Sequence, residues 1–463
     1  MQNLSYNPIL DTDSYKPSHQ FSYPKEVTGM FAYIEARTKK DIIVPFGMTM
    51  YLRRYLSQKI TVAHIDEAEK FFAAHGEPFE REPWEYIVAK YGGYFPVVIR
   101  AVPEGMPVKS LNAIATISCV DPKVFWIASY IETQLLRAIW YPTTIASQDY
   151  AIKKVIKQFY EATGADLSML PFALHDFGAR GTTSYEQSEI GGAAHMVNFM
   201  GSDTVAGIRA ANFYYGEPMS GFSVPATEHS VECAFGDEGE LSYLENTIDN
   251  LGSKFKIVSI VIDGYDVYRA AQTLCTTLKD KIIASGVKVV FRPDSGDMME
   301  IVPRILELQA ATFGFDLNTK GFKKIRHVGL LQGDGICHET IVELLQKITS
   351  MGFAADNIVF GSGGALLQKV NRDSYKFAQK ASAIMVDGEW KGISKNPITD
   401  PGKRSKEGVL TTVRSKMTGE VSTARIDLGP LDADFKDIME TVYSYGEIFE
   451  TPTLSVVRQR CAL

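Results

Sequence analysis

Cysteine is scarce in this sequence, with five residues in 463, and no two cysteines have the spacing of a metal site. They are scattered and odd in number, which indicates reduced thiols and a cytoplasmic protein. The GxxxxGK[ST], HExxH, GxSxG and CxxC motifs are also missing. Their absence argues against the commonest nucleoside-triphosphatase, metalloprotease, serine-hydrolase and thiol-redox classes. The cysteines are Cys119, Cys233, Cys275, Cys337 and Cys461.

An excess of positive charge is missing too, because the formal net charge is -7. We therefore expect no nucleic-acid partner. The most apolar long stretch, 124–146, is interrupted by Glu132, Arg137 and Pro142, which predicts a buried helix and no membrane span. The N-terminus has no charged region before an apolar stretch, so we expect no signal peptide.

Hydrophobic residues nevertheless make up 45% of the chain, which is enough for a sizeable core. Between residues 170 and 370, short apolar runs alternate with helical patterns such as 298–312 and 338–351. This alternation is typical of βα units with a parallel sheet. In a βα barrel, the loops after the strands converge on one face and build the active site there. A doubly wound sheet is the alternative fold.

The flanking regions have a different pattern, and we expect the end of the chain to pack with its beginning. Residues 1–165 and 385–463 would form a discontinuous α+β sheet domain, and residues 166–384 a βα barrel domain with the substrate-binding loops. The predicted elements outside the barrel are a strand at 95–102, helices at 123–140 and 148–163, and a strand pair at 409–415 and 421–428.

Four apolar runs in the barrel region end in polar loops, which begin at Asp263, Arg292, Gln332 and Gly361. Each loop alone is compatible with an ordinary turn, since Gly and Asp are common turn residues. Four such loops in series, one with an arginine directly after the strand, favour a binding site. The predicted parallel topology would bring all four to the same edge of the sheet.

The loop GSGG at residues 361–364 predicts a phosphate site, because a glycine-rich turn before a helix exposes backbone N–H groups. Arg372 and Lys380 follow and would add positive charge. The alternative is a tight turn without a ligand. In the loop RPDSG, Arg292 is suited to phosphate oxygens and Asp294 to ribose hydroxyls. There the alternative is an internal Arg–Asp pair.

Three further segments carry residues suited to a flat heterocycle and to proton or phosphate transfer. HDFGARG presents Phe177 for stacking beside the cation Arg180. GSDTVAG contains Asp203, which either caps a helix or accepts a hydrogen bond from a carboxamide. SVPATEHS places Glu228 next to His229, a pair suited to acid–base or nucleophilic chemistry.

Together these segments resemble nicotinamide phosphoribosyltransferases, and the resemblance runs from about Tyr6 to about Gly408. The short stretch after Arg37 suggests a microbial or viral member. The motifs that carry the resemblance, in chain order, are TDSYK, HDFGxRG, GxDTVAG, SVPAxEHS, RPDSG, QGDG, GSGGxLLQKxxRD and DPxKRSKxG.

The resemblance implies a type II phosphoribosyltransferase fold and a homodimer with shared active sites. Nicotinamide would lie between Phe177 and Tyr15 of the partner subunit, and Asp203 would bind its carboxamide. His229, with Glu228 beside it, would be phosphorylated by ATP. The remaining binding residues implied by the resemblance or by the polar loops are Arg37, Arg180, Asp263, Arg292, Asp294, Gly333, Asp334, Gly363, Gly364, Arg372, Lys380 and Lys403.

The implied reaction converts nicotinamide and phosphoribosyl diphosphate to nicotinamide mononucleotide and diphosphate, as part of NAD salvage. We expect Mg²⁺ as cofactor and stimulation by ATP hydrolysis through a phosphohistidine, while the motifs do not identify the metal ligands. One alternative is a nicotinate phosphoribosyltransferase, which the Asp203 carboxylate disfavours because it would repel an acid. The other is a non-catalytic binding or signalling protein on the same fold.

Overall fold

The computed structural model describes residues 5–38, 42–399, 404–449 and 451–463. The chain divides into two compact units. Unit 1 contains residues 1–147, 214–216 and 371–462, and unit 2 contains residues 148–213 and 217–370 together with Leu463. The chain thus leaves unit 1 and later returns to it.

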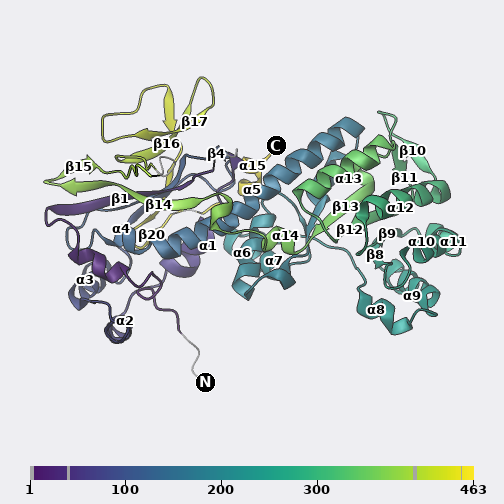
Figure 1. Cartoon of the computed structure of the whole chain (residues 1–463), viewed down its shortest axis with the longest axis horizontal. Coiled ribbons are helices and arrows are strands. Elements are labelled where there is room, and N and C mark those ends of the chain that lie inside the picture. Colours follow the sequence, from purple (N-terminus) through teal and green to yellow (C-terminus); the bar gives the residue numbers. More distant parts are fainter. Residues whose placement is uncertain (1–4, 39–41, 400–403, 450) are drawn as a thin grey trace. The chain divides into compact units, whose positions relative to one another are not determined.

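Unit 1 is built on a seven-stranded antiparallel sheet in the order β15-β14-β1-β5-β3-β19-β20. β1 lies in the interior of this sheet, and nine of its ten residues are buried. Figure 1 shows this sheet with α4 on one face, where the helix packs against β1 and β5. The strands are β1 (Val27–Ala36), β3 (Val98–Ala101), β5 (Ala113–Cys119), β14 (Phe377–Val386), β15 (Glu389–Gly392), β19 (Glu440–Ser444) and β20 (Glu447–Ile448).

A second antiparallel sheet in unit 1 confirms the strand pair expected near the end of the chain. Its order is β17-β16-β18, and β16 packs against β5 of the larger sheet. The strands of this second sheet are β16 (Leu410–Ser415), β17 (Val421–Arg425) and β18 (Phe435–Asp437). The remaining elements of unit 1 are β2 (Ile42–Ile43), β4 (Val108–Lys109), α1 (Met48–Tyr51), α2 (Val62–His75), α3 (Arg81–Tyr91), α4 (Ile127–Tyr130) and α15 (Leu454–Cys461).

Unit 2 contains a six-stranded parallel sheet in the order β7-β6-β13-β12-β9-β8. The segment 222–226 forms parallel bridges with Gly201 at one edge and with Ser259 at the other. The sheet is therefore curled into a barrel, and the doubly wound alternative is wrong. The strands are β6 (Leu174–Asp176), β7 (Gly201–Ser202), β8 (Ile257–Val261), β9 (Lys288–Arg292), β12 (Val328–Gln332) and β13 (Ile358–Ser362).

Helices cover the outside of this barrel, as Figure 1 shows for α12 and α13. In α13, Ile341, Leu344, Leu345 and Ile348 are buried, so one helical face packs on the sheet. The elements around the barrel are α6 (Tyr185–His195), α7 (Val205–Tyr215), α8 (His229–Phe235), α9 (Glu240–Gly252), α10 (Val267–Cys275), α11 (Lys279–Ser285), α12 (Met298–Phe313), α13 (His338–Ser350), α14 (Gly364–Leu367) and the strand pair β10 (Phe315–Leu317) and β11 (Lys323–Ile325).

The helix α5 (Glu132–Thr163) corrects the expectation of two helices at 123–140 and 148–163. It is continuous through Pro142, although an internal proline removes one helical hydrogen bond. The Ala138 carbonyl, which Pro142 leaves without its helical donor, faces Gly47, where a Cβ would lie 2.7 Å from the oxygen. Gly47 has a φ of 104°, which glycine adopts without strain.

The boundaries of the units differ from the expected limits at 165 and 385 for two structural reasons. The first boundary, between Ser147 and Gln148, falls inside the continuous helix α5. The second lies at 370, because β14 pairs with β1 along its length and so belongs to unit 1. The strand expected at 95–102 is also shorter, since it begins at Val98, two residues after Pro96.

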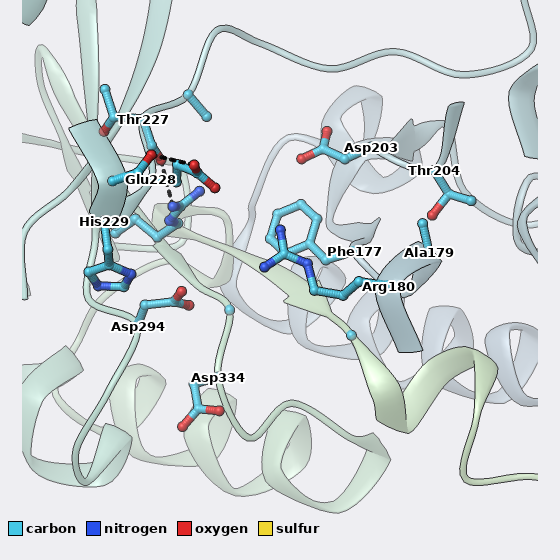
Figure 2. A pocket seen from close by; sticks show the side chains of 15 residues that line it. Phe177, Ala179, Arg180, Asp203, Thr204, Thr227, Glu228, His229, Asp294 and Asp334 are labelled. Carbon is cyan, nitrogen blue, oxygen red and sulfur yellow. Dashed lines mark hydrogen bonds between the residues drawn. The ribbon is translucent and has the colours of Figure 1, made fainter. Parts of the chain in front are cut away.

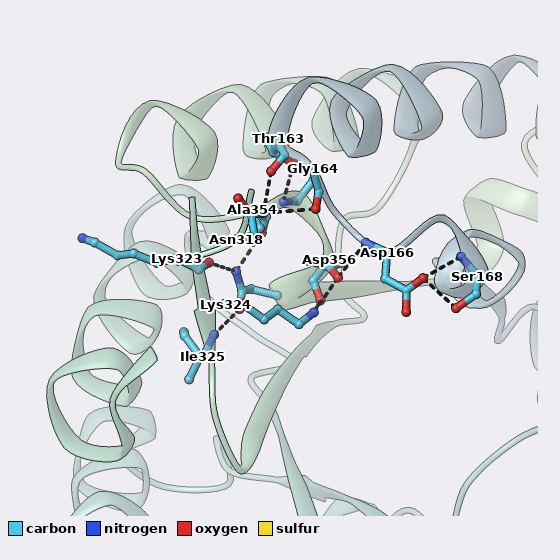
Figure 3. Close-up of polar contacts among 12 residues, drawn as sticks. Thr163, Gly164, Asp166, Ser168, Asn318, Lys323, Lys324, Ile325, Ala354 and Asp356 are labelled. Atoms are coloured by element: carbon cyan, nitrogen blue, oxygen red, sulfur yellow. Dashed lines mark hydrogen bonds and ion pairs between the residues drawn. The ribbon is translucent and has the colours of Figure 1, made fainter. Parts of the chain in front are cut away.

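The amino ends of the barrel strands are joined by a polar network, shown in Figure 3. Asn318 donates to the carbonyls of Thr163 and Gly164 at the end of α5, at 2.7 and 3.1 Å. Lys324 of β11 pairs with the buried Asp356 at 2.6 Å. Residues at this end of a βα barrel contribute to stability, whereas the opposite end carries the active site.

Candidate functional site

A cavity of about 970 Å³ opens at the carboxyl ends of the barrel strands. Figure 2 shows polar side chains and the Phe177 ring gathered around it from separate loops. Ten residues singled out in the sequence line this space. The cavity is lined by Phe177, Ala179, Arg180, Asp203, Thr204, Ala226, Thr227, Glu228, His229, Ser230, Arg292, Asp294, Gly333, Asp334 and Gly363.

Phe177 follows β6, and its backbone N–H donates to the Ser362 carbonyl at 2.9 Å. Its ring lies against the backbone of Gly361, where any Cβ would overlap Cδ2 and Cε2 of the ring. A Cβ on Gly333 would lie 3.6 Å from the same ring and 2.7 Å from the Asp294 carboxylate. The two glycines therefore make room for the aromatic ring at the floor of the cavity.

Asp203 follows β7 and is exposed to the cavity. Its backbone N–H donates to the Asp176 carbonyl at 2.9 Å, and its carboxylate accepts a hydrogen bond from the Ser223 hydroxyl. The Ser202 hydroxyl, and not Asp203, accepts from the Thr204 N–H before α7. Because α7 begins at Val205, Asp203 lies one residue before the usual capping position, and its side chain lines the cavity.

His229 begins α8, and its Nε2 lies 3.0 Å from a carboxylate oxygen of Asp263. The Asp263 side chain is 2% exposed, whereas that of His229 is 46% exposed. Because a carboxylate accepts, we assign the proton to Nε2, which leaves the lone pair on Nδ1. Glu228 precedes the helix and accepts a hydrogen bond from the Ser230 hydroxyl. The arrangement is that of an oriented, accessible imidazole nucleophile.

Arg292 is the last residue of β9, and its Nη2 donates to the Thr227 carbonyl at 2.6 Å. Its buried Nε has no hydrogen-bond partner among the described residues. Over the same residues it forms no ion pair with Asp294, so the internal-pair interpretation fails. Arg180 is exposed, and Asp294 and Asp334 also line the cavity. These two cations and two carboxylates thus line the same cavity as the aromatic ring.

The glycine-rich turn after β13 also contributes to the site. Gly363 lines the cavity, and Gly364 begins the short helix α14. A Cβ on Gly181, after the Phe177–Arg180 loop, would lie 3.4 Å from Cα of Gly364. Because both positions are glycines, the two loops approach each other closely at this end of the cavity.

The other expected residues belong to unit 1, except for Lys403, which lies outside the described residues. Arg37 pairs with Glu35 at 2.8 Å, and its buried Nη2 has no hydrogen-bond partner in the described chain. Arg372 pairs with Asp373 at 3.2 Å. Tyr15 is 50% exposed.

Lys380 lies in a cluster of cations that sequence reasoning identified only in part. Burial, together with the nearby Arg37, Lys395 and Lys16, lowers the pKa of Lys380, against the opposing effect of Glu132. Lys16 and Lys395 were missed as candidates. Lys16 could have been found, since it ends the TDSYK motif, whereas Lys395 stands in a loop without a distinctive pattern.

No group of three His, Cys, Asp or Glu residues in the described ranges is arranged to hold a metal ion. The cavity carboxylates Asp294 and Asp334 fit a Mg²⁺ that takes most of its ligands from substrate phosphates and water, which is the usual mode for this ion. Within the same ranges, no helix is both long and apolar enough to cross a bilayer.

Comparison with known proteins gives matches along nearly the whole chain. The family model of nicotinate phosphoribosyltransferases matches residues 172–447, and the model of the N-terminal domain of nicotinamide phosphoribosyltransferase matches residues 7–99. A nicotinamide phosphoribosyltransferase of Xanthomonas campestris is 44% identical over 456 residues, which covers 98% of this chain and 97% of that protein. One from Acinetobacter baylyi is 30% identical over 498 residues, with coverage of 98% and 97%.

Solved structures share the fold at low sequence identity. The nicotinate-nucleotide pyrophosphorylase of Pyrococcus furiosus has a TM-score of 0.65 at 16% identity and covers 100% of this chain and 97% of its own. Human nicotinic acid phosphoribosyltransferase has a TM-score of 0.57 at 14% identity, with coverage of 97% and 92%. The type II phosphoribosyltransferase fold expected from the motifs is thereby confirmed. The chain belongs to the nicotinamide phosphoribosyltransferase family.

Proposed function

We propose that this enzyme transfers the phosphoribosyl group of phosphoribosyl diphosphate to nicotinamide, releasing diphosphate, in the salvage of NAD. The observation that carries this proposal is the pairing of the Phe177 ring with the exposed Asp203 carboxylate in one cavity. The near full-length similarity to nicotinamide phosphoribosyltransferases supports the same substrate.

In the proposed complex, the pyridine ring stacks on Phe177 and its carboxamide NH₂ donates to Asp203. The Ser223 hydroxyl, which donates to this carboxylate, helps to orient it. A nicotinic acid carboxylate in the same place would face a like charge and lose that hydrogen bond. Asp203 therefore selects the amide over the acid.

The reaction breaks the bond between ribose C1 and the diphosphate oxygen, and the diphosphate leaves with the electron pair. The lone pair of the pyridine nitrogen then forms the new bond to C1. Arg180 and Arg292 stabilise the negative charge that grows on the leaving group. Asp294 and Asp334 orient the ribose hydroxyls, and the turn at Gly363 and Gly364 receives the 5'-phosphate. Bound Mg²⁺ would supply further charge neutralisation.

We assign ATP stimulation to His229. With Nε2–H donating to Asp263, the Nδ1 lone pair attacks the terminal phosphate of ATP, the bond to the bridging oxygen breaks, and ADP leaves. The neighbouring Glu228 would help to hold the magnesium that accompanies these phosphates. The phosphohistidine then favours the binding of phosphoribosyl diphosphate until it is hydrolysed.

We also propose a homodimer in which Tyr15, Arg37, Arg372, Lys380 and Lys403 of the partner subunit complete each site. An exposed apolar stripe on α7 supports an interface, since Val205 and Phe213 are 64% and 75% exposed, and the neighbouring Met219 and Phe222 are 51% and 44% exposed. Phe177→Ala and Tyr15→Ala subunits should each be inactive alone, and mixing them should restore activity at the one intact composite site. No restoration in a verified heterodimer would reject the shared site.

The activity is tested by offering nicotinamide and nicotinic acid separately with phosphoribosyl diphosphate and Mg²⁺, each with and without ATP. Turnover of nicotinamide that ATP increases is the expected result. Preference for nicotinic acid would favour the nicotinate enzyme, and no turnover of either would favour a binding protein. The five free cysteines support the proposed cytoplasmic location.

A further inference from the structure

Three ionisable side chains are fully buried in unit 2, below the loops that carry Phe177 and Asp203. They are Asp149 on α5, Asp176 at the end of β6, and His195, the last residue of α6. None of them lines the cavity, and the proposed mechanism uses none of them. Buried charges are costly unless they are paired, so their presence here requires an explanation.

The His195 ring is held by contacts on both nitrogens and on one face. Nδ1 lies 2.7 Å from the Asp149 carboxylate, and Nε2 lies 2.9 Å from the Gly201 carbonyl. Since a carbonyl only accepts, Nε2 carries a proton and donates it to Gly201. The Phe199 ring stacks on the imidazole with centroids 5.5 Å apart and planes 19° apart. His195 thus fixes the position of the Gly201 carbonyl.

Gly201 lies two residues before Asp203, at the start of the two-residue strand β7. On its other side is the His175 ring, which a Cβ at Gly201 would approach to 2.5 Å. Gly201 therefore packs against the His175 ring and accepts a hydrogen bond from His195. Because β7 is so short, a shift of Gly201 moves the backbone of Asp203 with it.

Asp176 connects the same cluster to the backbone of both loops that carry Phe177 and Asp203. Its Oδ1 accepts from the Gly178 N–H at 2.7 Å, and its carbonyl accepts from the Asp203 N–H at 2.9 Å. Burial raises the pKa of Asp176 and of Asp149. Burial opposes a charge on His195, but the two carboxylates outweigh it and raise the pKa of the imidazole. The His195 imidazole therefore has carboxylates on one side that favour its protonated form, in addition to the hydrogen bond that it donates to Gly201.

We propose that His195 is a positioning residue for amide selectivity: through the Gly201 carbonyl it holds Asp203 where the carboxamide must lie. This role rests on the proposed function of Asp203. It predicts that discrimination between nicotinamide and nicotinic acid depends on an imidazole that never touches either substrate.

Two polar variants of His195 test its two hydrogen bonds, to Asp149 and to Gly201, one at a time. In His195→Gln, the amide nitrogen takes the place of Nε2 and can still donate to Gly201. In His195→Asn, the amide takes the place of Nδ1, so the contact with Asp149 remains and the bond to Gly201 is lost. Both variants keep a polar group in the cluster, and we expect both to fold with reduced thermal stability.

We expect His195→Asn to raise the KM for nicotinamide by roughly 10- to 100-fold, the loss typical of an ångström-scale misplacement. The preference for amide over acid should fall, and the KM for phosphoribosyl diphosphate should stay near that of the wild type. His195→Gln should keep most of the selectivity. A merely structural role would lower stability in both variants without changing the ratio of the two substrates, and that result would overturn the proposal.

Gln309→Leu is the matched control, because the buried Gln309 donates to the Gly329 carbonyl at 3.0 Å near the other end of the barrel. It should lower stability and leave both substrate preferences unchanged. The wild-type assay distinguishes a failure of the function proposed for Asp203 from a failure of the role proposed for His195. No wild-type preference for nicotinamide would reject the function of Asp203, whereas a preference that survives in His195→Asn would reject only the role of His195.

Discussion

The Phe177 ring occupies the space beside Gly361 so closely that no residue with a Cβ fits at position 361 without moving the ring. The ring carries the stacking surface of the proposed base site. Gly361 itself does not line the cavity, so its contribution is to leave space. The shape of the pocket therefore depends on a residue without a side chain in the strand below it.

Gly361→Ala should raise the KM for nicotinamide by about 5- to 150-fold, because an overpacked contact costs roughly 1–3 kcal/mol. The KM for phosphoribosyl diphosphate should change much less. Gly329→Ala is the control in β12, since the nearest atom to a Cβ there is Cε of the flexible Lys288 side chain at 3.0 Å, and Val290 lies at an ordinary contact distance of 3.6 Å. Equal effects of the two substitutions on nicotinamide would contradict the role of Gly361. Steady-state kinetics with each substrate varied in turn provides the measurement.

Asp203→Asn should weaken nicotinamide and improve nicotinic acid, because the variant removes both a charged acceptor and a like-charge repulsion. A hydrogen bond to a charged group contributes about 1.5–3 kcal/mol, so the selectivity ratio should change by at least tenfold. Ser223→Ala, which removes only the hydroxyl that donates to Asp203, should cause a smaller change in the same direction. Competition between the two bases in one assay measures the ratio directly. An unchanged ratio in Asp203→Asn would remove this residue from base recognition.

Asp263→Asn should abolish most of the stimulation by ATP and leave slow basal synthesis, and so should His229→Ala. The Asp263 carboxylate orients the imidazole and stabilises its positive charge at 3.0 Å. Transfer of labelled terminal phosphate from ATP to the protein should disappear in both variants. Asp266→Asn is the control, because Asp266 caps α10 by accepting from Tyr268 and Arg269 N–H groups. Full phosphate transfer to His229→Ala would place the modification on another residue.

Asp356→Ala should destabilise the protein without changing KM or kcat at temperatures where it is folded. It removes a side chain that is 3% exposed, pairs with Lys324 and accepts from the Asp166 N–H. The expected loss is roughly 1–3 kcal/mol, measured by urea unfolding. Glu420→Ala removes an exposed pair with Lys109 and should change the free energy of unfolding much less, because solvent screens exposed ion pairs. Equal losses would show that the network at the amino ends is not a local source of stability.

Asp121 should contribute stability that depends on acid pH. Burial would raise the pKa of its carboxyl, but hydrogen bonds from Lys90, Tyr91, the Lys123 N–H and Tyr86 lower this pKa to about 2. A depressed pKa stabilises the fold above the unfolded value near 4, and this contribution is lost as the pH falls toward 2. Urea unfolding of the wild type and Asp121→Asn should therefore differ at pH 6 and converge near pH 2. A constant difference would contradict this assignment.

The strand ends of the barrel could be predicted because their signal is local. Short apolar runs followed by polar turns identified β8, β9, β12 and β13, and parallel strands place those turns at one edge. The continuity of α5 could not be predicted, since Pro142 is a local break signal that the packing of Gly47 overrides. The role of Asp203 was ambiguous for a similar reason, because its partner Ser223 lies twenty residues away.

The cations of unit 1 show the same limit at longer range. Arg37 follows β1 and Lys380 lies in β14, two strands that are far apart in the sequence and adjacent in the sheet. Charge alone does not distinguish such a cluster from solvated surface lysines. Only the folded structure brings Lys16 and Lys395, which lie outside the strands, close to Lys380.

The position of β1 between β5 and β14 has a consequence for synthesis on the ribosome. β5 emerges soon after β1, but β14 begins at Phe377, and at about 5–20 residues per second roughly 15 to 70 seconds separate β1 from this partner. During that interval one edge of an almost wholly buried strand lacks its native neighbour. The barrel unit, which apart from Leu463 ends at residue 370, can fold first, while the edge of β1 must be protected from pairing with other chains.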